Sequence, residues 1–195
     1  MKAMHHFIVE LESQFHDTIT TEGGIKFHID PKWNEFEYRV VEGPVKALPA
    51  KHDTPVSIGD TLYFHHLVVL QDGQRLGGTE KDFLVLYDPV TCVSNQAIAY
   101  KDQKTGEVEP LGDWCLLSPI PQEDDLTSEV IQGVQLKKKP PKTAKLWRGN
   151  VQTMEMGLIE GDVVGFKKNM DYSLMIDGEK KYRVDSSDLL FVYDD

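Results

Sequence analysis

The sequence predicts an all-β protein built from two tandem small β-barrels joined by a hairpin linker. Short runs in which apolar and polar residues alternate lie between turns rich in Gly, Pro and Asp, a pattern typical of small barrels and sandwiches. No segment keeps an apolar period of 3.6 residues over several turns, as an amphipathic helix would. The second half of the chain also repeats the motifs of the first half in the same order, which indicates a duplicated domain.

The predicted strands are short and bounded by turn residues. They cover residues 7–11, 37–42, 61–64, 67–70, 83–87, 97–100, 114–118, 145–152, 163–167, 173–176 and 189–193. Each half then has about 80 residues, close to the size at which a lone core is marginal. We therefore expect the barrels to depend on each other or on a partner for stability.

Four pairs of motifs carry the repeat. They match 7–10 with 114–117, 58–64 with 160–166, 67–69 with 174–176, and 82–88 with 188–194. The second pair is a Gly-Asp turn that leads into a strand, and the third runs into an Asp-Gly hairpin turn. Their order predicts a first barrel over residues 1–88, a linker hairpin over 89–112 and a second barrel over 113–195.

The composition is that of an acidic globular protein. The 195 residues include 32 Asp and Glu against 21 Lys and Arg, so the formal net charge is −11. An acidic surface repels nucleic-acid phosphates and anionic lipids, so we expect binding to neither nucleic acid nor membrane. With two cysteines, no leader-like segment and no apolar run of about 18 residues, the protein is expected to be cytoplasmic.

The sequence gives no reason to expect catalysis, a cofactor or a metal site. It contains no nucleophile-elbow, zinc-protease, Walker or C-x-x-C motif. The neighbours in His5-His6 and in His65-His66 point to opposite faces of a strand, so neither pair is expected to share an ion. The basic run 137–142 has the residues of a phosphate-binding patch. The favoured interpretation is a solvated loop that offsets the acidic residues 123–125.

Each repeat contains one long stretch, at about 13–33 and about 121–143, that lacks the pattern of a strand. Loops of this length are usually functional or disordered. Near each tip a glycine precedes an apolar–polar–apolar triplet, in Gly23-Gly24-Ile25-Lys26-Phe27 and in Gly133-Val134-Gln135-Leu136. The first and third residues of such a triplet project to the same side of an extended chain. Each loop is thus predicted to present two apolar side chains on a mobile stalk; the alternative is a plain β-hairpin whose apolar residues pack on their own barrel.

Each repeat resembles the GroES-type co-chaperonin of the chaperonin-10 family. The resemblance rests on the opening strand 7–10, the Gly-Gly-Ile at 23–25, the Gly-Asp turns at 59–60 and 161–162, and the closing segment 184–192. It implies tandem GroES-like barrels that form a homo-oligomeric ring. It further implies that the two loop tips, residues 23–27 and 133–136, bind a GroEL-type chaperonin, and that the ring assists protein folding as a lid, without catalysis.

A different class of function stays open beside this one. Duplicated barrels with altered loop tips are also what a structural or assembly module would use, for example in a virion or another large complex. The two hypotheses differ in the state of the first loop tip, which should be mobile in a co-chaperonin and rigid in a structural module.

Overall fold

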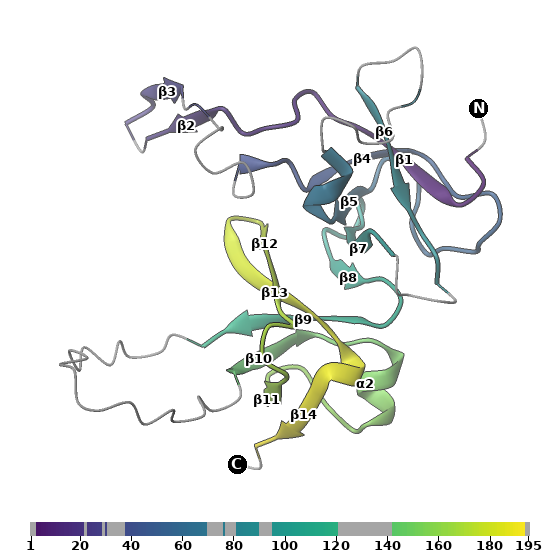
Figure 1. Cartoon of the computed structure of the whole chain (residues 1–195), viewed down its shortest axis with the longest axis vertical. Coiled ribbons are helices and arrows are strands. Elements are labelled where there is room, and N and C mark those ends of the chain that lie inside the picture. Colours follow the sequence, from purple (N-terminus) through teal and green to yellow (C-terminus); the bar gives the residue numbers. More distant parts are fainter. Residues whose placement is uncertain are drawn as a thin grey trace. The chain divides into compact units, whose positions relative to one another are not determined.

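The computed structural model describes residues 3–21, 23–28, 30, 38–69, 76, 81–89, 95–120 and 142–193 (Figure 1). The chain divides into two compact units, Met1–Gly112 and Asp113–Asp195. Each unit holds one six-stranded antiparallel sheet, and the described part of the chain contains one short α-helix. The prediction of a mostly β fold with two tandem sheets is confirmed, whereas closure of each sheet into a barrel stays a prediction.

The sheet of the first unit has the strand order β6-β1-β4-β5-β7-β8. Its strands are β1 (His6–Glu10), β4 (Glu42–Ala47), β5 (Thr61–Phe64), β6 (Asp82–Leu86), β7 (Ala97–Lys101) and β8 (Val108–Pro110). A separate two-stranded sheet consists of β2 (Thr18–Thr20) and β3 (Lys26–His28). Strands β7 and β8 come from the segment expected to link the barrels, and they continue the first sheet beyond β5.

The sheet of the second unit has the strand order β12-β13-β9-β10-β11-β14. Its strands are β9 (Trp114–Pro119), β10 (Lys142–Arg148), β11 (Val163–Phe166), β12 (Tyr172–Ile176), β13 (Glu179–Asp185) and β14 (Leu189–Val192). The helix α2 (Val151–Glu155) lies between β10 and β11, and the 3₁₀ turn η3 (Ser186–Asp188) precedes β14.

Each unit has its own cluster of buried apolar side chains. The first cluster includes Phe7, Phe64 and Phe83, and the second includes Leu146 and Phe166. Every residue named here is at most 2% exposed, so each contributes close to its full transfer free energy, about 1.5–3 kcal/mol per side chain. The thiol of Cys115 lies in the second cluster, where burial raises its pKa to about 12.

The Gly-Asp turns are built in the same way in both units. Gly59 and Gly161 have φ angles of 96° and 100°, a conformation that side chains disfavour. Their N–H groups donate to the carbonyl oxygens of Val45 and Leu146 at 2.9 and 2.8 Å. In each turn the aspartate carboxylate accepts a bond from the backbone N–H three residues earlier. The turn equivalence predicted from the sequence is therefore present in three dimensions.

The pairing partners change one of the predicted strand matches. β1 lies between β4 and β6, and the equivalent β9 lies between β10 and β13, so β13 is the counterpart of β6. β14 instead pairs with β11, in the place that β7 occupies beside β5. The match of residues 82–88 with 188–194 is thus wrong, because two strands with the same alternation of residues lie at different positions in their sheets.

Three strand assignments also differ from the prediction. Residues 66–69 form the 3₁₀ helix η2 (His66–Val69) instead of a strand, and the strand expected at 37–42 begins only at Glu42. The strand expected at 145–152 ends at Arg148, because Asn150 caps α2. Asn150 Oδ1 accepts from the N–H of Thr153 at 2.9 Å, while Thr153 Oγ1 accepts from the N–H of Asn150 at 2.8 Å, a reciprocal capping box.

Candidate functional site

The tip of the first predicted loop is a short β-hairpin. Strands β2 and β3 pair in the register Thr18↔His28 and Thr20↔Lys26 (Figure 1). The turn closes with the N–H of Gly24 donating to the Thr21 carbonyl at 2.8 Å and the N–H of Thr21 donating to the Ile25 carbonyl at 2.9 Å. Gly24 has a φ of 79°, the left-handed conformation that a turn ending in a glycine bulge requires.

The side chains of this tip face solvent. Ile25 is 60% exposed and Phe27 is 55% exposed, and residues 23–28 are all exposed. Because Ile25 and Phe27 are two positions apart on an extended strand, they project to one side, and Lys26 projects to the other. The hairpin form matches the alternative considered from the sequence, but its two apolar side chains are not buried as that alternative required.

The stem of the hairpin is tied to the rest of the first unit. Phe15 and Arg39 form an isolated antiparallel bridge. The N–H of His16 donates to the Tyr38 carbonyl at 2.7 Å, and the N–H of Val40 donates to the Gln14 carbonyl at 3.0 Å. Val40 packs against the first apolar cluster, so the stem continues directly from the core.

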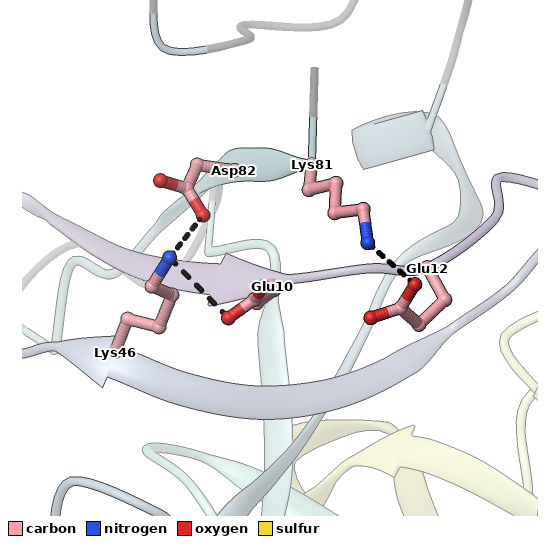
Figure 2. A network of polar contacts seen from close by, with 5 residues as sticks. All are labelled: Glu10, Glu12, Lys46, Lys81 and Asp82. Carbon is pink, nitrogen blue, oxygen red and sulfur yellow. Dashed lines mark hydrogen bonds and ion pairs between the residues drawn. The ribbon is translucent and has the colours of Figure 1, made fainter. Parts of the chain in front are cut away.

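Ion pairs lie where β1 ends and the stem begins (Figure 2). The ammonium of Lys46 on β4 lies 2.9 Å from Asp82 and 3.3 Å from Glu10, and Lys81 lies 2.6 Å from Glu12. The hydrogen bonds to Asp82 and then to Glu10 raise the pKa of Lys46. These contacts join β4, β1 and β6 at the point from which the hairpin segment leaves the sheet.

The second predicted tip, Gly133, Val134, Gln135 and Leu136, lies outside the described residues. The strands on either side of that segment are described: β9 ends at Pro119, and Ala144 on β10 pairs with Pro119. In the first unit the hairpin likewise connects β1 to its partner β4. Both predicted tips therefore belong to connections between equivalent pairs of strands.

A group of exposed apolar residues around α2 was not predicted from the sequence. Val151, Met154, Met156 and Ile159 are all exposed in the connection between β10 and β11. The equivalent connection of the first unit exposes one large apolar residue, Ile58; its other exposed residues are Ala50, Lys51, Asp53, Pro55 and Ser57. The sequence signal that could have predicted this helix is Asn150 as its cap, followed by apolar residues at a spacing of three.

Within the described ranges, no cluster of three or more His, Cys, Asp and Glu side chains is arranged to hold a metal ion. No helix among the same residues has the length and apolar character needed to cross a bilayer.

Two tandem antiparallel sheets, with an exposed apolar hairpin tip in the described connection between β1 and β4, define a tandem β-sheet protein. No family model matches the sequence. The chain is 33% identical over 92 residues to the co-chaperonin GroES of Coprothermobacter proteolyticus, an alignment that covers 44% of this chain and 94% of that protein. The chain therefore belongs to the GroES co-chaperonin family.

Proposed function

We propose that the protein is a non-catalytic co-chaperonin that binds a GroEL-type chaperonin through its two loop tips and acts as a lid during protein folding. The observation that carries the proposal is the hairpin between β1 and β4, on which Ile25 and Phe27 stand exposed side by side. An exposed pair of large apolar side chains on a narrow projection fits insertion into an apolar groove of a partner.

The energetics of such a contact suit a reversible lid. Full burial of Ile25 and Phe27 supplies about 1.5–3 kcal/mol for each side chain, before the cost of ordering the segment. One tip therefore binds weakly, whereas several tips held in one assembly bind together through their effective concentration. In this proposal Gly23 and Gly24 shape the turn, Lys26 faces away from the groove, and residues 133–136 form the second tip.

We further propose that the chain assembles into a homo-oligomeric ring through the outer edge of β14. In the first unit the outer edge of β7 is covered by β8, whereas β14 is the last strand of its sheet in the described part of the chain. Its exposed apolar residues are Leu190, Phe191 and Val192, followed by Tyr193. An open apolar edge favours addition of a strand from a second copy.

Retention on an immobilised GroEL-type chaperonin, with nucleotide present, tests the proposed contact. The wild-type chain should be retained, and the double variant Ile25→Asp with Val134→Asp should not be, because a carboxylate cannot enter an apolar groove without a large desolvation cost. Ile58→Asp is the matched control, since Ile58 is 66% exposed and lies at the Gly-Asp turn of the same unit. That control should be retained like the wild type.

Equal retention of the wild type and the double variant would remove the two tips from the proposal. Loss of retention in the Ile58→Asp control would show instead that any charge on the exposed surface disrupts binding. Sedimentation of each variant checks that its assembly state is unchanged.

A structural or assembly module is a second candidate, and one observation favours it. The first tip already has hairpin hydrogen bonds in the isolated chain, with Thr21 Oγ1 also accepting from the N–H of Ile25 at 3.2 Å. Limited proteolysis separates the two candidates. Rapid cleavage within 23–27 supports the co-chaperonin, and resistance together with copurification in a large non-chaperonin particle supports the module.

A further inference from the structure

Two histidines that are far apart in the sequence meet in the first unit. His5 lies just before β1, and His52 lies in the connection between β4 and β5. Their side-chain nitrogens, Nδ1 of His5 and Nε2 of His52, are 3.2 Å apart, and the ring planes are inclined at 50°. The sequence pattern drew attention to His5-His6, but the fold pairs His5 with a residue 47 positions away.

Backbone hydrogen bonds hold the two segments that carry these rings. The N–H groups of Ala50 and Lys51 donate to the carbonyls of Ala3 and Met4 at 2.8 and 3.0 Å. The N–H of Tyr87 donates to the carbonyl of His5 at 2.9 Å. The His52 ring also meets the Tyr87 ring edge-on, with the centroids 6.2 Å apart. The backbone segments that carry the two imidazoles are therefore joined before any ligand arrives, which lowers the ordering cost of binding.

The spacing of the two nitrogens suits a chelated ion. With metal–nitrogen bonds of about 2.0–2.1 Å, two nitrogens at this separation subtend an angle of about 100° at the ion. That angle lies between the values for square-planar and tetrahedral coordination. Imidazole nitrogens are good ligands for zinc, copper and nickel and poor ligands for magnesium or calcium.

We propose that His5 and His52 form a bidentate surface site for a borderline divalent transition-metal ion, with water in the remaining positions. Affinity should follow the general order for nitrogen ligands, with Cu²⁺ tighter than Ni²⁺ and Zn²⁺. A bound ion cross-links the segment before β1 to the segment after β4 and so stabilises the folded first unit by mass action.

Titration of the full chain with ZnCl₂ and with CuSO₄, followed by calorimetry, tests the site. The wild type should bind one ion per chain, and either His5→Gln or His52→Gln should weaken binding at least about tenfold, since one imidazole alone does not chelate. His16→Gln is the matched control, because His16 is exposed and makes its hydrogen bond to Tyr38 through its backbone N–H. This control should bind like the wild type.

Equal affinity in the wild type and in the double variant His5→Gln with His52→Gln would overturn the proposal and leave an ordinary imidazole–imidazole hydrogen bond. If the variants do not fold, nuclear magnetic resonance of the wild type decides. Substoichiometric Cu²⁺ should broaden the imidazole signals of His5 and His52 before those of the other histidines, and uniform broadening would contradict the site.

Discussion

The two units place a lysine at the same point of their sheets but on different strands. In the first unit Lys46 on β4 reaches across to Glu10 on β1 and Asp82 on β6 (Figure 2). At the equivalent point of the second unit Lys181 on β13 donates to Ser118 on β9 at 3.0 Å and lies 4.3 Å from the centre of the Trp147 ring on β10. In the three strands β4, β1 and β6 the lysine lies on β4. In the equivalent strands β10, β9 and β13 it lies on β13, the counterpart of β6.

A second exchange of the same kind occurs in the neighbouring ladder. Tyr63 on β5 faces Ala99 on β7, whereas at the equivalent pair Gly165 on β11 faces Phe191 on β14. The aromatic ring has crossed from one strand to the other, and the small residue has crossed in return. At each of these two places the sheet keeps the same kind of side chain, a lysine or an aromatic ring, but the strand that carries it differs between the units.

The largest effect should come from breaking one core and leaving the other intact. Phe64 and Phe166 occupy equivalent positions at the ends of β5 and β11, and both are fully buried. Phe64→Ala and Phe166→Ala should each lower the free energy of unfolding by about 3–5 kcal/mol. Trp114 and Trp147 belong to the second unit and Trp33 to the first, so the variants are made in a Trp33→Phe background, in which tryptophan fluorescence reports on the unfolding of the second unit.

In a denaturant titration, Phe166→Ala should shift the midpoint of the tryptophan transition, and Phe64→Ala should leave that midpoint nearly unchanged. Equal shifts of the tryptophan signal in both variants would contradict separate cores and mean that the two clusters unfold as one cooperative unit.

An intermediate effect is expected from Gly165, because a Cβ at that position would collide with the ring of Phe191. Gly165→Ala should cost about 1–3 kcal/mol through overpacking. The double variant Gly165→Tyr with Phe191→Ala copies the first unit and should recover stability relative to Gly165→Tyr alone. Thermal unfolding of the two single variants and the double variant gives the coupling energy between the two positions. Strictly additive effects would show that the two positions do not interact.

The smallest effect should follow from Lys46, whose side chain is 45% exposed. Its pKa is raised in the folded protein, so its stabilising contribution is present below the ordinary lysine pKa of 10.5 and is lost as pH rises above that value. The variant Lys46→Met should narrow the stability difference between pH 8 and pH 11 seen in the wild type. Lys104→Met is the control at an exposed lysine, and an unchanged pH profile in Lys46→Met would argue against the network.

The features predicted correctly from the sequence depend on local chemistry. The Gly-Asp turns at Gly59 and Gly161, and the Asp-Gly turn at Asp177-Gly178, with φ angles of 52° and 80°, require particular residues at particular positions. The wrong match of residues 82–88 with 188–194 had another origin, since pairing partners lie far apart in the chain and alternating strands resemble one another. Likewise, a 3₁₀ turn at 66–69 cannot be distinguished from a strand by its apolar content.

For the candidate site, the exposed pair Ile25 and Phe27 followed from the glycine before the triplet and from the alternation of an extended chain. The hairpin was only the alternative interpretation of this segment, because strands of three residues such as β2 and β3 leave little periodic signal. The pairing of His5 with His52 had no sequence signal, since it depends on how the connection after β4 returns to the start of β1.

The covered edge of β7 has a practical consequence for dissecting the chain. A fragment ending at Gly112 ends its sheet on β8, a strand of only three residues in which Val108 is buried and Pro110 has no N–H to donate. A fragment beginning at Asp113 keeps β14, whose exposed apolar residues offer a template for strand addition. The first fragment should remain monodisperse on concentration, whereas the second should self-associate. The two halves of this duplicated chain are thus expected to differ in solubility.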